Sequence, residues 1–247
     1  MSRDGQRLMV VMPHPDDECF GCAATIARYS AQGASVSLVT MTRGGAGFWN
    51  GRDTGDLRRL TDVRELELRA AAAELGVRFL EVFDYPDGAL ERVEEVDEVR
   101  DRFVGDIVRS LRVHRPQVVI CFGPEGNYGH PDHRVVSRLT VQACTLAGDA
   151  SAYELEAVAL GVSAWSPSKL YFQTATTMTV EALKLPAQPP ITTRISIAGF
   201  QEAKLRAFTE HRSQTQELEP LQKFVEGQGD VDVFSLVGAP DGLREED

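Results

Sequence analysis

The sequence predicts an α/β protein with a Rossmann-like fold, in which a mostly parallel sheet carries helices on both faces. Short uninterrupted apolar runs, such as residues 8–12 and 117–122, are typical of strands that are buried on both faces. Segments with helical spacing of apolar residues lie between these runs, and the clearest of them spans about residues 96–111. Regular alternation of strands and helices indicates right-handed β–α–β units and therefore a parallel sheet.

The elements of the first two thirds follow one another without a low-complexity linker. Pro13 stops the first strand, and Gly33 and Gly76 stop the first two helices. Residues 43–55 are polar and rich in glycine, which predicts a long loop, and residues 85–88 predict a turn. The expected strands are residues 8–12, 36–41, 78–83 and 117–122, and the expected helices are residues 18–32, 57–75, 96–111 and 133–147.

From about residue 154 the pattern is less regular, which predicts a more variable C-terminal third. We expect strands at residues 155–161, 169–174 and 191–197, followed by a helix at residues 199–211. The sequence contains no internal repeat and no obvious linker. The simplest organisation is therefore one domain that spans residues 1–247.

Composition and charge limit the classes of function. The chain has 247 residues, of which 43% are hydrophobic and 26% are charged, as in ordinary globular proteins. The net charge of -11 argues against nucleic acid as a partner, because a surface that binds phosphates needs clustered Lys and Arg. No apolar run approaches the roughly 18–20 residues of a membrane span, and the polar N-terminus does not resemble a signal peptide. We therefore expect a cytoplasmic protein.

Two short clusters carry the chemistry. His14 and Asp17 are three residues apart just after the first strand, and His130 and His133 are three residues apart shortly after the fourth. Ligands of open parallel sheets bind at the carboxyl ends of strands, where the strand order reverses. Two imidazoles and one carboxylate are a usual set for a catalytic zinc that keeps one position open for water. Asp16 and Asp17 are neighbours in a turn and should point in different directions, so that one could bind the metal while the other faces the metal-bound water. Taken alone, however, each cluster is more often a solvated turn or a helix cap.

Together the clusters resemble a known family. The sequence His-Pro-Asp-Asp-Glu at residues 14–18, followed by Gly-His-Pro-Asp-His at residues 129–133, is similar to the zinc-dependent N-deacetylases of the PIG-L/LmbE-like family. The resemblance covers roughly residues 8–215. Weaker similarities lie at Gly21, Cys22 and Thr25, at residues 42–45, at Arg64 and Glu65, at residues 86–88, and at Lys204, Ala207, His211, Ser213 and Gln214.

The resemblance implies a role for each matching residue. His14, Asp17 and His133 match the metal ligands, and Asp16 matches the general base. His130 matches the group that stabilises or protonates the intermediate, Tyr128 a tyrosine that polarises the amide carbonyl, and Asp132 a partner that orients an imidazole. The contacts to the sugar match Arg64, Asp87 and Gln214. Members of this family often form homo-oligomers, so the resemblance implies that a homo-oligomer is possible for this protein.

The reaction implied is hydrolysis of the acetamide of an N-acetylglucosamine-containing small molecule or conjugate, which releases acetate and a free 2-amino sugar. Zn²⁺ is the expected metal, and Fe²⁺ or another divalent ion is an alternative. A related metal-dependent amidase of the thiol-conjugate type, or a non-catalytic sugar-binding protein, are the other interpretations. A non-haem iron oxygenase also uses two His and one carboxylate, but such enzymes usually have β-barrel folds.

Two further interpretations have less support. Cys19 and Cys22 form a C-x-x-C pair between a predicted strand and helix, where a thioredoxin-like redox pair would lie. Small buried helix residues explain these cysteines more simply. A dinucleotide site would need a G-x-G-x-x-G turn after the first strand, and residues 13–15 are Pro-His-Pro instead.

Overall fold

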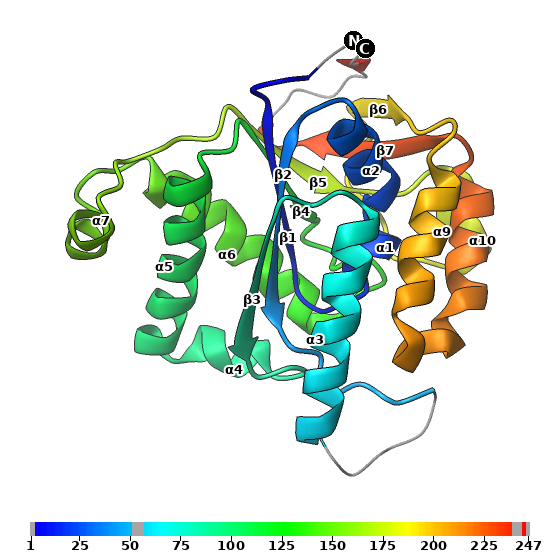
Figure 1. Cartoon of the computed structure of the whole chain (residues 1–247), viewed down its shortest axis with the longest axis horizontal. Helices are drawn as coiled ribbons and strands as arrows, with labels where there is room; N and C mark the ends of the chain where they lie inside the picture. The colour runs from blue at the N-terminus through cyan, green and yellow to red at the C-terminus, as the bar shows by residue number, and fades with distance from the viewer. Residues whose placement is uncertain (1–2, 51–56, 239–243, 246–247) are drawn as a thin grey trace.

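The computed structural model describes residues 3–50, 57–238 and 244–245, and they form a layered α/β structure (Figure 1). The sheet has the strand order β3-β2-β1-β4-β5-β7-β6-β8. Strands β3, β2, β1, β4 and β5 are parallel to one another, whereas β7 is antiparallel to both of its neighbours. The strands are β1 (Arg7–Met12), β2 (Ser35–Thr42), β3 (Phe79–Tyr85), β4 (Val118–Phe122), β5 (Lys169–Gln173), β6 (Thr193–Ser196), β7 (Val231–Leu236) and β8 (Arg244–Glu245).

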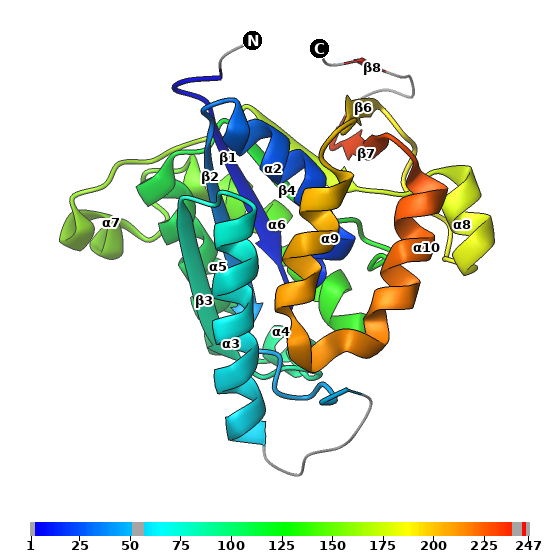
Figure 2. The same cartoon turned by 45° about the vertical axis from the view of Figure 1, so that its right-hand side comes forward.

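Helices cover both faces of the sheet. Side chains of β1 alternate between two hydrophobic clusters, with Leu8, Val10 and Met12 on one face and Met9 and Val11 on the other. The first face carries α1 (Asp17–Phe20), α2 (Ala23–Ala31), α3 (Leu57–Glu74), α9 (Gln201–Glu210) and α10 (Leu218–Gln228). The second carries α4 (Leu90–Glu95), α5 (Asp97–His114) and α6 (Pro131–Ala147). Figure 2 shows α9 and α10 side by side, joined at one end by the short 3₁₀ helix η1 (Arg212–Glu217).

The α/β fold class and the mostly parallel sheet with helices on both faces are confirmed. The predicted single helix 18–32 is wrong, because α1 and α2 are separated at Gly21 and Cys22. A Cβ atom at Gly21 would lie 2.8 Å from Cε of Met12 and 3.1 Å from the carbonyl oxygen of Asp17. The chain therefore passes closely over the end of β1 at this point. Residues 51–55 of the predicted loop lie outside the described residues.

Most of the other corrections lie in the C-terminal third. Residues 155–161 were expected as a strand but form helix α7 (Glu154–Leu160), which ends at Gly161 with a φ of 65°. Its apolar side chains suggested a strand, yet Leu155 and Val158 are 84% and 74% exposed. The predicted strand 191–197 is confirmed in its central part as β6. Helices α4, α8 (Thr177–Leu183) and α10 and strand β7 were not predicted.

The topology creates a crevice beside β1. Strand β1 pairs with β2 on one side and with β4 on the other, so the direction of chain progression reverses there. In open α/β sheets ligands bind at the carboxyl ends of the strands at such a point. The first histidine cluster follows β1, and the second follows β4. No helix in the described part of the chain is both long and apolar enough to cross a membrane.

Candidate active site

A sharp turn after β1 places the first cluster. β1 ends at Met12, and α1 begins at Asp17, whose Oδ2 accepts a hydrogen bond of 2.8 Å from the backbone N–H of His14. Between them Asp16 has a φ of 91°, in the left-handed region. Such a conformation costs a non-glycine residue about 1–3 kcal/mol and persists only where neighbours hold it. The turn therefore keeps Asp16 and Asp17 pointing differently.

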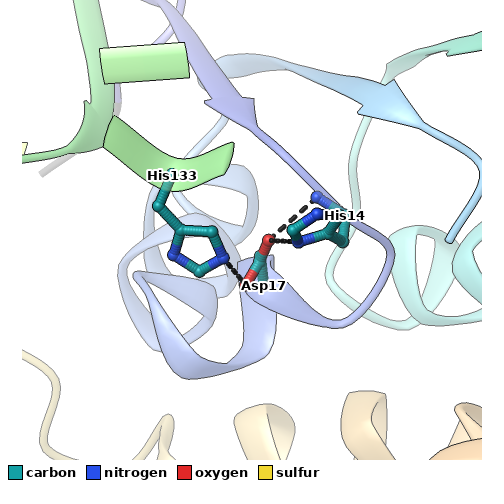
Figure 3. A group of neighbouring side chains, drawn as sticks. All are labelled: His14, Asp17 and His133. Carbon is teal, nitrogen blue, oxygen red and sulfur yellow. Dashed lines mark hydrogen bonds and ion pairs between the residues drawn. The ribbon is translucent and has the colours of Figure 1, made fainter. Parts of the chain in front are cut away.

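Three side chains from the two clusters meet in front of this turn (Figure 3). Nδ1 of His14 lies 3.1 Å from Oδ2 of Asp17, and Nε2 of His133 lies 3.3 Å from Oδ1 of the same carboxylate. The potential ligand atoms of the three residues all lie within 4.8 Å of one another. His133 comes from the first turns of α6, and its ring stacks on Phe122 at the end of β4 with 4.7 Å between ring centroids.

The donor set fits a divalent metal. Both ring nitrogens of His133 are buried and make no hydrogen bond within the described structure, which is rare for buried polar atoms. Burial lowers the pKa of His133 to about 4, so its imidazole is neutral, the form that binds metals. Burial alone would raise the pKa of the Asp17 carboxyl group, but the imidazoles of His133 and His14 outweigh this effect and lower it. A divalent metal ion bound by these three residues would give the buried ring of His133 a partner.

Two outer carboxylates fix the orientation of His14. Its Nε2 lies 3.0 Å from Oδ1 of Asp87 and 3.1 Å from Oδ2 of Asp132. Burial alone would lower the pKa of His14, but hydrogen bonds with Asp132, Asp17 and Asp87 raise it well above its ordinary value. Asp132 is itself fixed by backbone N–H groups of Gly88 and Leu90, at 2.7 and 3.0 Å. A carboxylate behind an imidazole is the usual outer partner of a metal-binding histidine.

Asp16 lies beside the cluster and outside it. Its Oδ2 accepts a hydrogen bond of 3.0 Å from Nη2 of Arg64, which also donates to the carbonyl oxygen of Pro15 at 2.6 Å. Burial raises the pKa of Asp16 to about 7, although the Arg64 cation acts in the opposite direction. A carboxyl group that titrates near neutral pH is suited to accept and return a proton.

His130 and Tyr128 lie beside the metal cluster, with ring centroids 4.8 and 5.3 Å from that of His133. His130 is the N-cap of α6, and its Nδ1 accepts a hydrogen bond of 3.2 Å from the backbone N–H of Asp132. Nδ1 therefore carries no proton, so the neutral ring has its N–H at Nε2. Burial and the nearby His14 lower the pKa of His130, which favours this neutral form. Tyr128 is 59% exposed, with its ring centroid 5.7 Å from that of His130.

A cavity of about 610 Å³ opens onto the site and is lined by Asp16, Tyr128 and His130 and by His14 and Asp17 of the metal cluster, with His133 buried behind it. Arg64, Asp87 and Gln214, the expected sugar contacts, all lie on its wall. Asp87 also accepts a hydrogen bond from the backbone N–H of Ala46, at 2.7 Å, and Nε2 of Gln214 donates to the carbonyl oxygen of Phe48, at 2.8 Å. Asp132 is 1% exposed and faces His14 from behind, so it lies outside the cavity lining. The lining is completed by an apolar wall that includes Phe20, Phe48, Leu183, Leu185, Pro220 and Phe224.

The structure also shows a buried pair whose contact was not predicted. Nε2 of His211, after α9, lies 2.7 Å from Oε1 of Glu18, and both side chains are 0% exposed. Burial acts to lower the pKa of His211, but Glu18 raises it above its ordinary value. Glu18 belongs to the first cluster, and His211 is one of the residues that resemble the family more weakly. The contact between them could not be predicted from the sequence.

The cysteines give no support to redox chemistry. Cys19 and Cys22 are both fully buried, and neither forms a disulfide. Burial raises the pKa of both thiols, which disfavours the reactive thiolate. Sγ of Cys19 donates to Oε1 of Glu18 at 3.3 Å.

Comparisons with known proteins agree with this geometry. Residues 9–144 match the family model described as PIG-L, GlcNAc-PI de-N-acetylase. A 1D-myo-inositol 2-acetamido-2-deoxy-alpha-D-glucopyranoside deacetylase of Streptomyces scabiei is 32% identical over 89% of this chain and 80% of its own length.

Solved structures share the fold. N,N'-diacetylchitobiose deacetylase from Pyrococcus horikoshii superposes with a TM-score of 0.76 and 24% identity, over 94% of this chain and 84% of that one. A 4-carboxy-2-hydroxymuconate hydratase from Pseudomonas putida superposes with a TM-score of 0.74 and 17% identity, over 97% and 99% of the two chains. The hydratase shows that this fold alone does not determine a reaction. The sequence match over more than half of the chain does determine the family: this protein belongs to the PIG-L family.

Proposed function

We propose that this protein is a metal-dependent N-deacetylase, which hydrolyses the acetamide of an N-acetylglucosamine-containing small molecule or conjugate. The products are acetate and a free 2-amino sugar. One observation carries the proposal: a buried His–Asp–His cluster has a separate carboxyl group beside it, poised near neutrality. The named relative in Streptomyces scabiei acts on a substrate of this kind.

His14, Asp17 and His133 would hold the metal. Zn²⁺ is our choice, because two imidazoles and one carboxylate with an open position form a catalytic zinc site, and Fe²⁺ suits the same donors. The bound metal supplies Lewis acidity toward the acyl oxygen and lowers the pKa of a water molecule at the site. Asp87 and Asp132 keep the His14 ring oriented by accepting from its Nε2.

Asp16 is the general base in this proposal. It is adjacent in sequence to the ligand Asp17, but its carboxylate contacts Arg64 and lines the cavity. As a base it removes a proton from the attacking water, and it then returns that proton to the leaving amine when the C–N bond breaks. A purely sugar-binding protein would have no need for this carboxyl group.

In this proposal His130 and Tyr128 stabilise the negatively charged oxygen of the tetrahedral intermediate that forms when water attacks the acetamide carbonyl. The N–H of His130 is at Nε2, because Nδ1 accepts from Asp132. A neutral imidazole of this kind donates a hydrogen bond to the developing negative charge. Partial burial and the surrounding carboxylates raise the pKa of Tyr128, which keeps its phenol protonated as a second donor. Arg64, Asp87 and Gln214 on the wall are proposed to bind sugar hydroxyl groups.

The deciding experiment measures amine release from a panel of N-acetylglucosaminides and one thiol-conjugate amide, with and without a chelator. We expect chelator-sensitive release of a free amine from at least one glucosaminide, restored by added Zn²⁺. Binding of these compounds without any hydrolysis would contradict the enzyme and favour a sugar-binding protein. Hydrolysis of the thiol-conjugate amide alone would favour the related amidase.

A further inference from the structure

Asp16 is held in an unfavourable backbone conformation, and the group that holds it is Glu18. The backbone N–H of Asp16 donates to Oε2 of Glu18 at 3.0 Å, within the same turn that gives Asp16 its φ of 91°. The other carboxylate oxygen of Glu18 accepts from His211 at 2.7 Å. The backbone of the proposed base is thus tied through one buried carboxylate to an imidazole almost 200 residues away.

The spacing of Glu18, Cys19 and His211 could also suit a metal, because their potential ligand atoms lie within 4.8 Å of one another. The contacts favour another role. Both oxygens of Glu18 already accept hydrogen bonds, from Asp16, His211 and Cys19. The carboxylate of Glu18 is therefore already engaged by groups of the protein, and its hydrogen bond to Asp16 supports the turn after β1.

We propose that Glu18 and His211 are positioning residues for the reaction, which act only through Asp16. His211 fixes the carboxylate of Glu18, and Glu18 fixes the backbone of Asp16 so that its side chain stays beside the metal ligands and apart from them. Arg64 holds the other end of Asp16 by its carboxylate. The inference rests on the proposed role of Asp16 as the general base.

The test is a double-mutant cycle. Glu18→Gln and His211→Gln are each made in the parent protein and in Asp16→Asn. In the parent we expect kcat to fall by about 10–100-fold, the range for partners behind a site, while KM and bound zinc change little. In Asp16→Asn, where no base remains to be positioned, the same substitutions should lower kcat further by no more than about twofold.

A matched control is available outside the site. Glu81 on β3 and His114 on α5 form a carboxylate–imidazole pair with 2.5 Å between Oε1 and Nε2. Glu81→Gln and His114→Gln should lower the melting temperature without lowering kcat. Melting curves of all variants separate loss of fold from loss of positioning, and His211→Gln leaves the Glu18 carboxylate in place should Glu18→Gln not fold.

Each outcome is distinct. Equal losses of kcat in both backgrounds, or loss of zinc from Glu18→Gln and His211→Gln, would overturn the positioning role. Full turnover in Asp16→Asn alone would instead overturn the proposed base, and with it the function as argued. A large loss of kcat in Asp16→Asn, together with additive effects of Glu18→Gln on its residual turnover, would leave the base intact and reject only this inference.

Discussion

At the scale of single residues, two adjacent aspartates have different chemistry because their neighbours differ. Burial acts to raise the pKa of both carboxyl groups. At Asp17 the imidazoles of His133 and His14 outweigh burial and lower the pKa. At Asp16 burial dominates and raises the pKa to about 7. Neighbouring acids whose pKa values are driven apart are typical of a ligand or nucleophile beside a proton carrier.

Replacement of Asp16 by Asn tests this division. The substitution keeps the shape of the side chain and removes its basicity, so kcat should fall by about 100-fold or more while metal content is retained. Asp17→Asn should lose metal and activity together. Elemental analysis of both variants beside their kcat values provides the measurement. An Asp16→Asn protein without metal would show that this residue is a ligand.

The Arg64 cation helps to set the pH at which the Asp16 carboxyl group ionises. Because Arg64 lowers the pKa of the carboxyl group beside it, Arg64→Gln should raise that pKa. A base works only when ionised, so activity is lost as the pH falls through its pKa. The acidic limb of kcat/KM should therefore move to higher pH in Arg64→Gln, and less so in Arg64→Lys, which keeps the charge. An unmoved limb would assign it to another group.

At the scale of elements, the turn from β1 into α1 and α2 depends on Gly21. Its φ is -74°, so close packing and not conformational freedom requires a glycine there. The Cβ of Gly21→Ala would meet Cε of Met12 and the carbonyl oxygen of Asp17. Overpacking of this kind costs about 1–3 kcal/mol. A melting temperature equal to that of the parent would contradict this account.

Elements of the first two thirds could be predicted because their strands are buried on both faces and give continuous apolar runs. Helix α7 could not be predicted, because its leucines and its valine are exposed and none of its residues is buried. Strand β7 inserts between β5 and β6, and such pairing of distant segments leaves no local signal.

For the site, the positions of the two clusters after β1 and β4 were enough to predict that the clusters meet. The contact of Asp132 with His14 and that of Glu18 with His211 depend on side-chain directions that spacing does not specify.

At the scale of the whole molecule, the proposed metal joins the ends of two strands whose ligands are more than 100 residues apart. A ligand that binds only the folded state stabilises it, by about 2.7 kcal/mol at 100 times its Kd. For a chain of this size zinc should raise the melting temperature by roughly 5–10 °C. His133→Ala should show no such rise. An equal rise in His133→Ala would place the zinc elsewhere.

The cavity described above has two origins in the chain. The proposed catalytic groups on its wall lie within the segment that matches the family model, as do Arg64 and Asp87, whereas the polar residues Gln214, Gln216 and Glu217 lie beyond it. Leu183, Leu185, Pro220 and Phe224, which form much of its apolar side, come from the C-terminal third, beyond that segment. The proposed catalytic groups thus lie in one stretch of sequence, whereas the wall that a substrate would contact is divided between that stretch and the C-terminal third. A chimaera that exchanges only residues beyond 150 should therefore keep the proposed catalytic groups and change the apolar part of the wall, so its preference among substrates should shift toward that of the donor.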